Sequence, residues 1–169
     1  MENGRVQILT RTLSRLPGDG GMDWDSPLCQ REEAETTGEY YERGGVRYCL
    51  YEEQPEGWEK PCKVLLKWKE AFLERQIRGE AASRMVFEPG NRHRASYRTS
   101  FGDLLLETDT HWLQAREEQG FISLALEYGI RQQGQTISEN RVKIRITPLV
   151  DTVKGFSDAG TQPGNGIEP

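Results

Sequence analysis

The chain has 169 residues, of which 35% are hydrophobic and 29% charged, and its formal net charge is −5. This length suits one domain with a sizeable core, and the acidic balance argues against a general nucleic-acid binder, which needs a basic face. No stretch approaches the ~20 apolar residues of a membrane span, and no secretory signal begins the chain.

Apolar and polar residues alternate with a period of two along most of the chain, which predicts β-strands rather than helices. Turn signals such as Gly44-Gly45 and Pro89-Gly90-Asn91 separate the runs. We expect ten short strands, at residues 6–13, 28–41, 46–53, 62–68, 72–78, 84–88, 92–98, 103–115, 121–131 and 140–148. Such a series predicts an all-β sandwich or a closed antiparallel barrel.

Two segments lie outside this strand pattern. Residues 16–27 are a loop by composition, and two interpretations of its Met22 and Trp24 remain open: they cover a barrel end, or they move freely. Residues 150–169 are rich in Gly, Pro, Asp and Thr, and we expect them to be a disordered tail. Residues 1–149 then form the single domain.

Charge is distributed unevenly along the chain. Residues 19–59 hold twelve acidic and three basic residues, whereas residues 60–116 hold eleven basic and seven acidic residues. We interpret this as two sides of one fold that attract each other, and a surface for a basic protein partner is the alternative.

The stretch from Arg92 to Asp109 is the clearest hairpin in the sequence. With residues 99–102 as its loop, three arginines face three acids, namely Arg98 and Asp103, Arg94 and Glu107, and Arg92 and Asp109. Opposite charges directly across an antiparallel pair stabilise it by a few tenths to about 1 kcal/mol. We therefore expect these arginines on a solvated outer face rather than in an anion-binding site.

The opposite face of this hairpin is expected to point into the barrel. It carries His93, Ala95 and Tyr97 on one strand and Leu104, Leu106, Thr108, Thr110 and Trp112 on the other. A one-residue slip would expose all of them at once, so the register is strongly specified. Trp112 is expected to fill the core together with Trp68.

Polar residues on inward faces define a candidate ligand site. Buried hydroxyl and imidazole groups must find partners, either one another or a bound molecule. Arg75 shares a side with Leu73 and Ile77, and inside the barrel its guanidinium would need a carboxylate, either that of Glu53 or that of a ligand. The alternatives are that this strand turns its other side inward, or that Arg75 reaches out at a barrel mouth. The candidate residues are Arg75, His93, Tyr97, Thr108, Thr110 and Tyr128.

Several blocks along residues 5–148 resemble the YwiB-like family of bacterial cytosolic proteins of unknown function. They are Gly38-Glu-Tyr-Tyr, Leu50-Tyr-Glu-Glu, Arg84-Met-Val-Phe-Glu-Pro-Gly, Tyr97-Arg-Thr-Ser-Phe-Gly, the strand with Leu104, Leu106 and Thr110, and Leu126-Glu-Tyr-Gly. The resemblance implies an eight-stranded closed calycin (lipocalin-like) barrel with room for side chains or one small ligand. Together with the alternation, it leads us to expect an all-β, closed, antiparallel up-and-down barrel of about eight to ten strands. It brings no catalytic or binding residues, and the loop 16–27 and the tail 150–169 depart from it.

Evidence for catalysis, a metal or a cofactor is thin. His93 and His111 are the only histidines, and no nucleophile elbow, P-loop, zinc-protease or dinucleotide motif is present. His111 shares a face with Asp109 and Glu107, so we expect it on the solvent side. The three cysteines form no Cys-x-x-Cys motif, which favours reduced thiols in a cytoplasmic protein. We expect no enzyme activity, no metal and no cofactor.

Two hypotheses for function follow. The first is a barrel that binds a small, partly apolar or anionic molecule non-covalently, with no nucleic-acid or membrane partner. The second is a structural or protein-interaction module with a filled barrel and an acidic surface. They differ in whether the barrel holds a continuous cavity of about 300 Å³ or more, and an exposed apolar patch beside a filled interior would favour the second.

Overall fold

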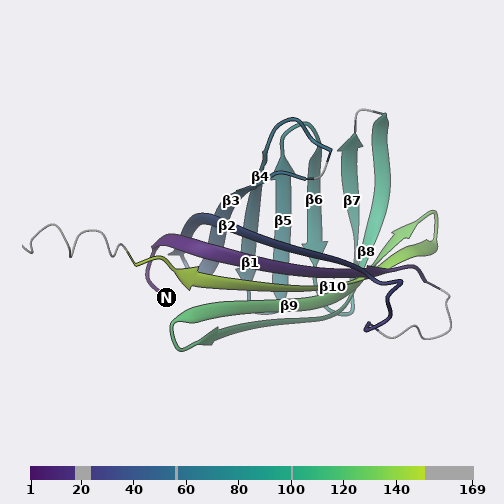
Figure 1. Ribbon diagram of the computed structural model, residues 1–169. Helices are drawn as coiled ribbons and strands as arrows, with labels where there is room; N and C mark the ends of the chain where they lie inside the picture. The colour runs from purple at the N-terminus through teal and green to yellow at the C-terminus, as the bar shows by residue number, and fades with distance from the viewer. Residues whose placement is uncertain (18–23, 56, 100, 151–169) are drawn as a thin grey trace, which may run out of the picture.

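The computed structural model describes residues 1–17, 24–55, 57–99 and 101–150, and these residues form a β-barrel (Figure 1). Its strands are β1 (Gly4–Arg15), β2 (Gln30–Arg43), β3 (Val46–Glu53), β4 (Cys62–Lys69), β5 (Phe72–Arg78), β6 (Ala82–Phe87), β7 (Arg92–Thr99), β8 (Gly102–Glu118), β9 (Phe121–Gln132) and β10 (Gln135–Pro148). Each strand pairs with the next in antiparallel fashion, and β10 closes the barrel on β1. The expected all-β, closed up-and-down fold is confirmed. The described part of the chain holds no helix long and apolar enough to cross a membrane.

Two long strands change partner along their length, and this bends the barrel. Residues 30–40 of β2 pair with β1, and residues 38–43 pair with β3. Residues 102–109 of β8 pair with β7, and residues 107–118 pair with β9. Strands β3–β7 consequently run across the direction of β1, β9 and β10 in Figure 1. The first halves of β2 and β8 each have one described strand neighbour.

Gly38 marks the place where β2 changes partner. A Cβ atom built on this residue would overlap the carbonyl oxygen of Leu50 and would lie 2.9 Å from Cβ of Tyr51. Only a residue without a side chain lets β1, β2 and β3 approach this closely.

The core lies inside the barrel, on most of the inward faces predicted from the alternation. The expectation that Leu104 is buried there is wrong: it is 44% exposed, because it lies in the first half of β8, which has one described strand neighbour. Trp68 is 2% exposed and fills the core as expected. The hairpin register is also confirmed, because Arg98 faces Asp103, Arg94 faces Glu107 and Arg92 faces Asp109. The outer pairs are loose, since Nε of Arg98 lies 3.6 Å from an Asp103 oxygen and Nε of Arg92 lies 3.6 Å from an Asp109 oxygen.

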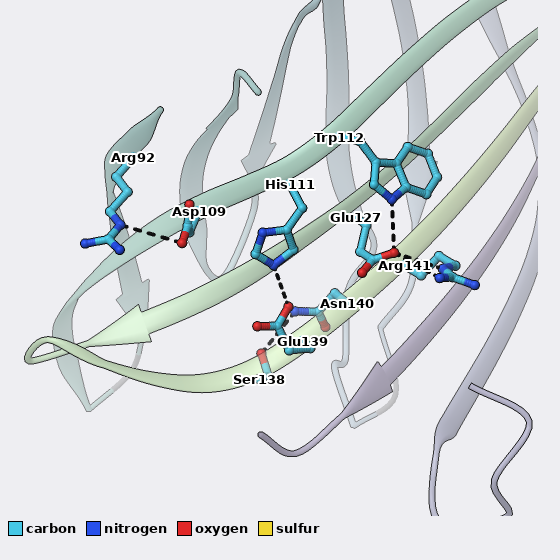
Figure 2. Close-up of polar contacts among 9 residues, drawn as sticks. All are labelled: Arg92, Asp109, His111, Trp112, Glu127, Ser138, Glu139, Asn140 and Arg141. Atoms are coloured by element: carbon cyan, nitrogen blue, oxygen red, sulfur yellow. Dashed lines mark hydrogen bonds and ion pairs between the residues drawn. The ribbon is translucent and has the colours of Figure 1, made fainter. Parts of the chain in front are cut away.

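The prediction that Trp112 fills the core is wrong, and a β-bulge is the reason. Thr110 pairs with Tyr128 and Trp112 pairs with Glu127, so His111 is an extra residue in β8. Beyond the bulge the alternation is reversed, and Leu113 and Ala115 pack against the core in place of Trp112. Trp112 is 37% exposed, and its indole N–H donates to Glu127 at 3.0 Å (Figure 2).

The bulge also sets the position of His111. Its Nε2 atom lies 2.8 Å from Oε2 of Glu139 on β10 (Figure 2), and its side chain is 39% exposed. The expectation of a solvent-side histidine is confirmed. Glu127 also pairs with Arg141 at 2.9 Å, so this outer face of β8, β9 and β10 is held together by polar contacts.

The first loop packs against the outside of the barrel where it can be followed. The guanidinium groups of Arg15 and Arg141 each lie over the ring of Trp24, with their central carbon atoms 4.2 and 4.7 Å from its centroid. Its carbonyl oxygen accepts a hydrogen bond from Arg31 at 2.7 Å. Trp24 therefore covers the outer surface of β1 and β10. Met22 and the predicted tail beyond residue 150 lie outside the described residues.

Candidate functional site

The barrel encloses a cavity of about 200 Å³ near the end where β1 finishes and β2 begins. Apolar side chains form part of its wall, and Leu66, Leu73 and Leu126 are fully buried there. The polar lining consists of Thr10, Thr12, Glu32, Tyr51, Glu53, Arg75 and Tyr128. This volume is below the roughly 300 Å³ that the sequence-based hypothesis of a ligand barrel required, so the cavity fits only a molecule smaller than a drug-sized ligand.

Arg75 points into this cavity, because the alternation of β5 places it on the same side as the buried Leu73 and Ile77. Its Nη2 atom lies 3.0 Å from Oε2 of Glu53, and its guanidinium lies close enough to Tyr51 to act on the pKa of that phenol. The side chains of the ion pair are 29% and 22% exposed. The sequence left open whether Arg75 pairs with Glu53 or with the carboxylate of a ligand. In the structure its partner is Glu53.

Two protonated phenols stand beside this ion pair. Burial raises the pKa of Tyr128 above its ordinary value of 10. Burial also raises the pKa of Tyr51, although the nearby Arg75 acts in the opposite direction. The Tyr128 ring packs on Phe87 with 4.6 Å between ring centroids. The cavity therefore offers neutral hydroxyl groups next to an apolar wall.

The charges at the cavity do not favour an anion. Glu32 is exposed at the solvent end of the lining, and Glu53 already neutralises Arg75. Two carboxylates thus accompany one guanidinium, and an incoming anion would meet net negative charge.

Thr108 has a structural partner rather than a place in the cavity. Its side chain is fully buried, and its hydroxyl donates to the carbonyl oxygen of Val86 at 2.7 Å. Strands β6 and β7 pair at two positions, where Ala82 faces Arg98 and Ser83 faces Tyr97. The hydrogen bond from Thr108 therefore connects β8 directly to β6 at Val86, where β6 no longer pairs with β7.

The other three predicted site residues also lie away from the cavity lining. Thr110 is 1% exposed, and its hydroxyl has no hydrogen-bond partner among the described residues. His93 is half-buried, and its Nε2 atom lies 3.5 Å from a Glu88 oxygen. Tyr97 is half-buried opposite Leu104. Of the six candidates, the structure brings together Arg75 and Tyr128.

Sequence reasoning missed Tyr51, Glu32, Thr10 and Thr12 as lining residues. A signal for Tyr51 was present, because Cys49, Tyr51 and Glu53 alternate on one side of β3. Thr10 and Thr12 continue the inward face that begins with Val6 and Ile8. The start of β2 is too polar to mark its inward face, so nothing in the sequence pointed to Glu32.

The cysteines are buried and free, at positions 29, 49 and 62. Burial raises the pKa of the Cys49 thiol to about 12, so this thiol is not a nucleophile near neutral pH. No group of three His, Cys, Asp or Glu residues close enough to hold a metal ion occurs in the described ranges.

Comparisons with known proteins identify a family but no activity. A family model described as a domain of unknown function (DUF1934) matches residues 24–144. The chain is similar to a protein whose structure is described as the crystal structure of ywiB protein from Bacillus subtilis, with a TM-score of 0.73 and 19% sequence identity over 88% of this chain and 94% of that chain. At this identity the likeness shows the fold alone. A search of curated proteins gives no match.

Proposed function

The chain belongs to the family described as a domain of unknown function (DUF1934), and from that premise we propose that its barrel binds one small, partly apolar molecule non-covalently. The observation that carries this proposal is the cavity of about 200 Å³ that joins an apolar wall to Arg75, Tyr51 and Tyr128. Convergent polar groups in an otherwise apolar pocket are typical of ligand sites. An uncharged ligand, or one that carries an amine, suits the net negative charge of the lining.

The binding is proposed to be non-enzymatic and the protein to be cytoplasmic. The described lining residues include no histidine and no cysteine, and Glu53, the carboxylate beside the Tyr51 hydroxyl, is already paired with Arg75. Free buried thiols at Cys29, Cys49 and Cys62 suit a reducing compartment.

Native mass spectrometry of the protein purified from its own host tests this proposal. We expect a stoichiometric adduct of small mass that disappears on denaturation. Arg75→Leu and Tyr128→Phe should each lower the adduct's occupancy, whereas Arg94→Gln on the outer face of β7 should leave it unchanged. A bare mass from the host, or equal occupancy in all three variants, would overturn the assignment of this cavity.

A protein-interaction module is the second candidate, and the end of the β7–β8 hairpin favours it. Leu105 is 75% exposed on the outer face of β8, and Phe101 in the turn before this strand is fully exposed. The simplest cover for such a patch is the same patch of a second copy, because a two-fold pair brings identical surfaces together. Sedimentation velocity would support this candidate if the protein is a dimer that Leu105→Asp dissociates, and a monomer at high concentration would count against it.

A further inference from the structure

The outer surface of β5, β6 and β7 carries a groove of about 450 Å³. None of the described residues that line the groove also lines the interior cavity. Arginines of three successive strands border it, namely Arg78, Arg84 and Arg98. Two of these arginines lie directly opposite a residue of the preceding strand: Arg84 faces Gln76 on β5, and Arg98 faces Ala82 on β6.

Arg84 is held in place by a buried carboxylate. Its Nε and Nη2 atoms lie 2.7 and 3.3 Å from the two oxygens of Glu74, a residue that is 4% exposed. Gln76 donates to the same carboxylate. Glu74 uses two of the five guanidinium N–H groups, and the Arg84 side chain remains 64% exposed at the groove. This arginine is thus fixed in orientation while part of it stays available.

Arg78 has no carboxylate partner among the described residues, and the residue directly opposite it on β4 is Lys63, a second cation. Like charges that face each other across a ladder are destabilising. Arg98 contacts Asp103 loosely, at 3.6 Å. The groove's three arginines therefore outnumber the two acids that contact them.

Ser83 also borders the groove, but its side chain points to the other face of β6 from Arg84. Ser83 faces Ile77 and Tyr97, whereas Arg84 faces Gln76. The buried Ser83 hydroxyl is therefore not part of the surface that the three arginines present.

We propose that this groove is a second binding site, which takes the phosphate group of a small molecule. Guanidinium groups recognise phosphate oxygens through pairs of N–H donors, and three of them from separate strands match a group with several anionic oxygens. Glu74 is a positioning residue for Arg84, and Arg78 supplies the charge that no carboxylate in the described structure neutralises. The site does not depend on the interior cavity.

Nuclear magnetic resonance of the arginine side chains, with phenyl phosphate as the probe, tests the proposal at low ionic strength. We expect the Nε–H signals of Arg78 and Arg84 to shift in a saturable way. Arg78→Gln should weaken the affinity about three- to tenfold, since one charged hydrogen-bonding group is lost at a partly exposed site. Arg43→Gln is the matched control, because Arg43 is an exposed arginine of β2 remote from the lining.

Two further comparisons make the result decisive. Benzyl alcohol carries the ring without the phosphate, and it should leave the arginine signals unchanged. Ser83→Ala should leave phenyl phosphate binding unchanged, because the Ser83 side chain lies on the other face of β6 from Arg84. Equal affinities for the Arg78→Gln and Arg43→Gln variants, or shifts spread over arginines outside the groove, would overturn the proposal.

Discussion

Arg75 on β5 and Glu53 on β3 form an ion pair inside the barrel, with 3.0 Å between Nη2 and Oε2. Strand β4 separates the two strands, so the pair spans two ladders and lies across the cavity lining. The contact joins the fold to the candidate site, because the same guanidinium that would meet a ligand also ties the wall together.

Glu53→Gln should lower the free energy of unfolding by about 1–2 kcal/mol. The loss of one partner from a buried pair costs more than this, but both side chains are partly exposed and water offsets some of the loss. Urea denaturation measures the change. Glu33→Gln is the control, because its pair with Arg11 is 71% and 72% exposed and should contribute less than about 0.5 kcal/mol. Equal effects of the two substitutions would contradict the structural role of Glu53.

Thr108→Val and Thr110→Val should have different effects, although both residues are buried on the same strand. Thr108→Val leaves the Val86 carbonyl oxygen without its donor and should destabilise the protein by about 1–2 kcal/mol. Thr110→Val removes a hydroxyl that has no partner in the described structure, so it should be neutral or stabilising. Thermal and urea unfolding of the two variants, side by side, decides the matter. A loss at Thr110 as large as the loss at Thr108 would mean that this hydroxyl has a partner after all.

Lowering the pH should reduce the free energy of unfolding of the wild-type protein more than that of the Glu74→Gln variant. The hydrogen bonds from Arg84 lower the pKa of Glu74 below its ordinary value of 4.5, although burial acts in the opposite direction. A carboxyl group with a lowered folded-state pKa stabilises the fold above the unfolded-state pKa, and this stabilisation is lost as the pH falls through the folded-state value. The stability difference between the two proteins should therefore shrink as the pH falls below the ordinary glutamate pKa of 4.5 and through the lowered pKa of Glu74. Glu59→Gln, an exposed site, is the control, and a constant difference at all pH values would refute the role given to Glu74.

Alkaline titration should show a late stage that comes from three buried tyrosines. Burial raises the pKa of Tyr40, Tyr51 and Tyr128 above 10, so their phenolate absorbance should develop only at higher pH. Because the unfolded chain loses these protons first, stability should fall as the pH rises above about 10. Tyr128→Phe should remove amplitude from the late stage alone. A single transition near the ordinary value for all tyrosines would show that the cavity is more open to water than the structure has it.

Much of the fold could be predicted because charge and apolar side chains point to the same register. In the β7–β8 hairpin, arginines face acids on one side while Ala95 and Thr108 are buried on the other. The two patterns agree only in one alignment, and a slip would reverse both.

The misplacement of Trp112 has a single physical origin, which is that one extra residue in β8 changes which side faces inward. Neither glycine nor proline marks the bulge at His111. An uninterrupted alternation along this strand therefore predicts, wrongly, that Trp112 lies in the core. Arg75 was predicted because Leu73 and Ile77 mark its side of β5. Glu32 was missed because its strand has no such markers where it borders the cavity.

The first half of β2 has a consequence for how fast anything enters or leaves the barrel. Residues 30–37 pair with β1, and pairing with β3 starts only at Gly38. A strand segment with one ladder separates at a lower free energy than the global unfolding transition. Glu32 lies in this segment and also lines the cavity. Amide exchange in residues 30–37 should therefore be faster than in β9, and the residence time of a guest should follow this local opening rather than the stability of the whole molecule.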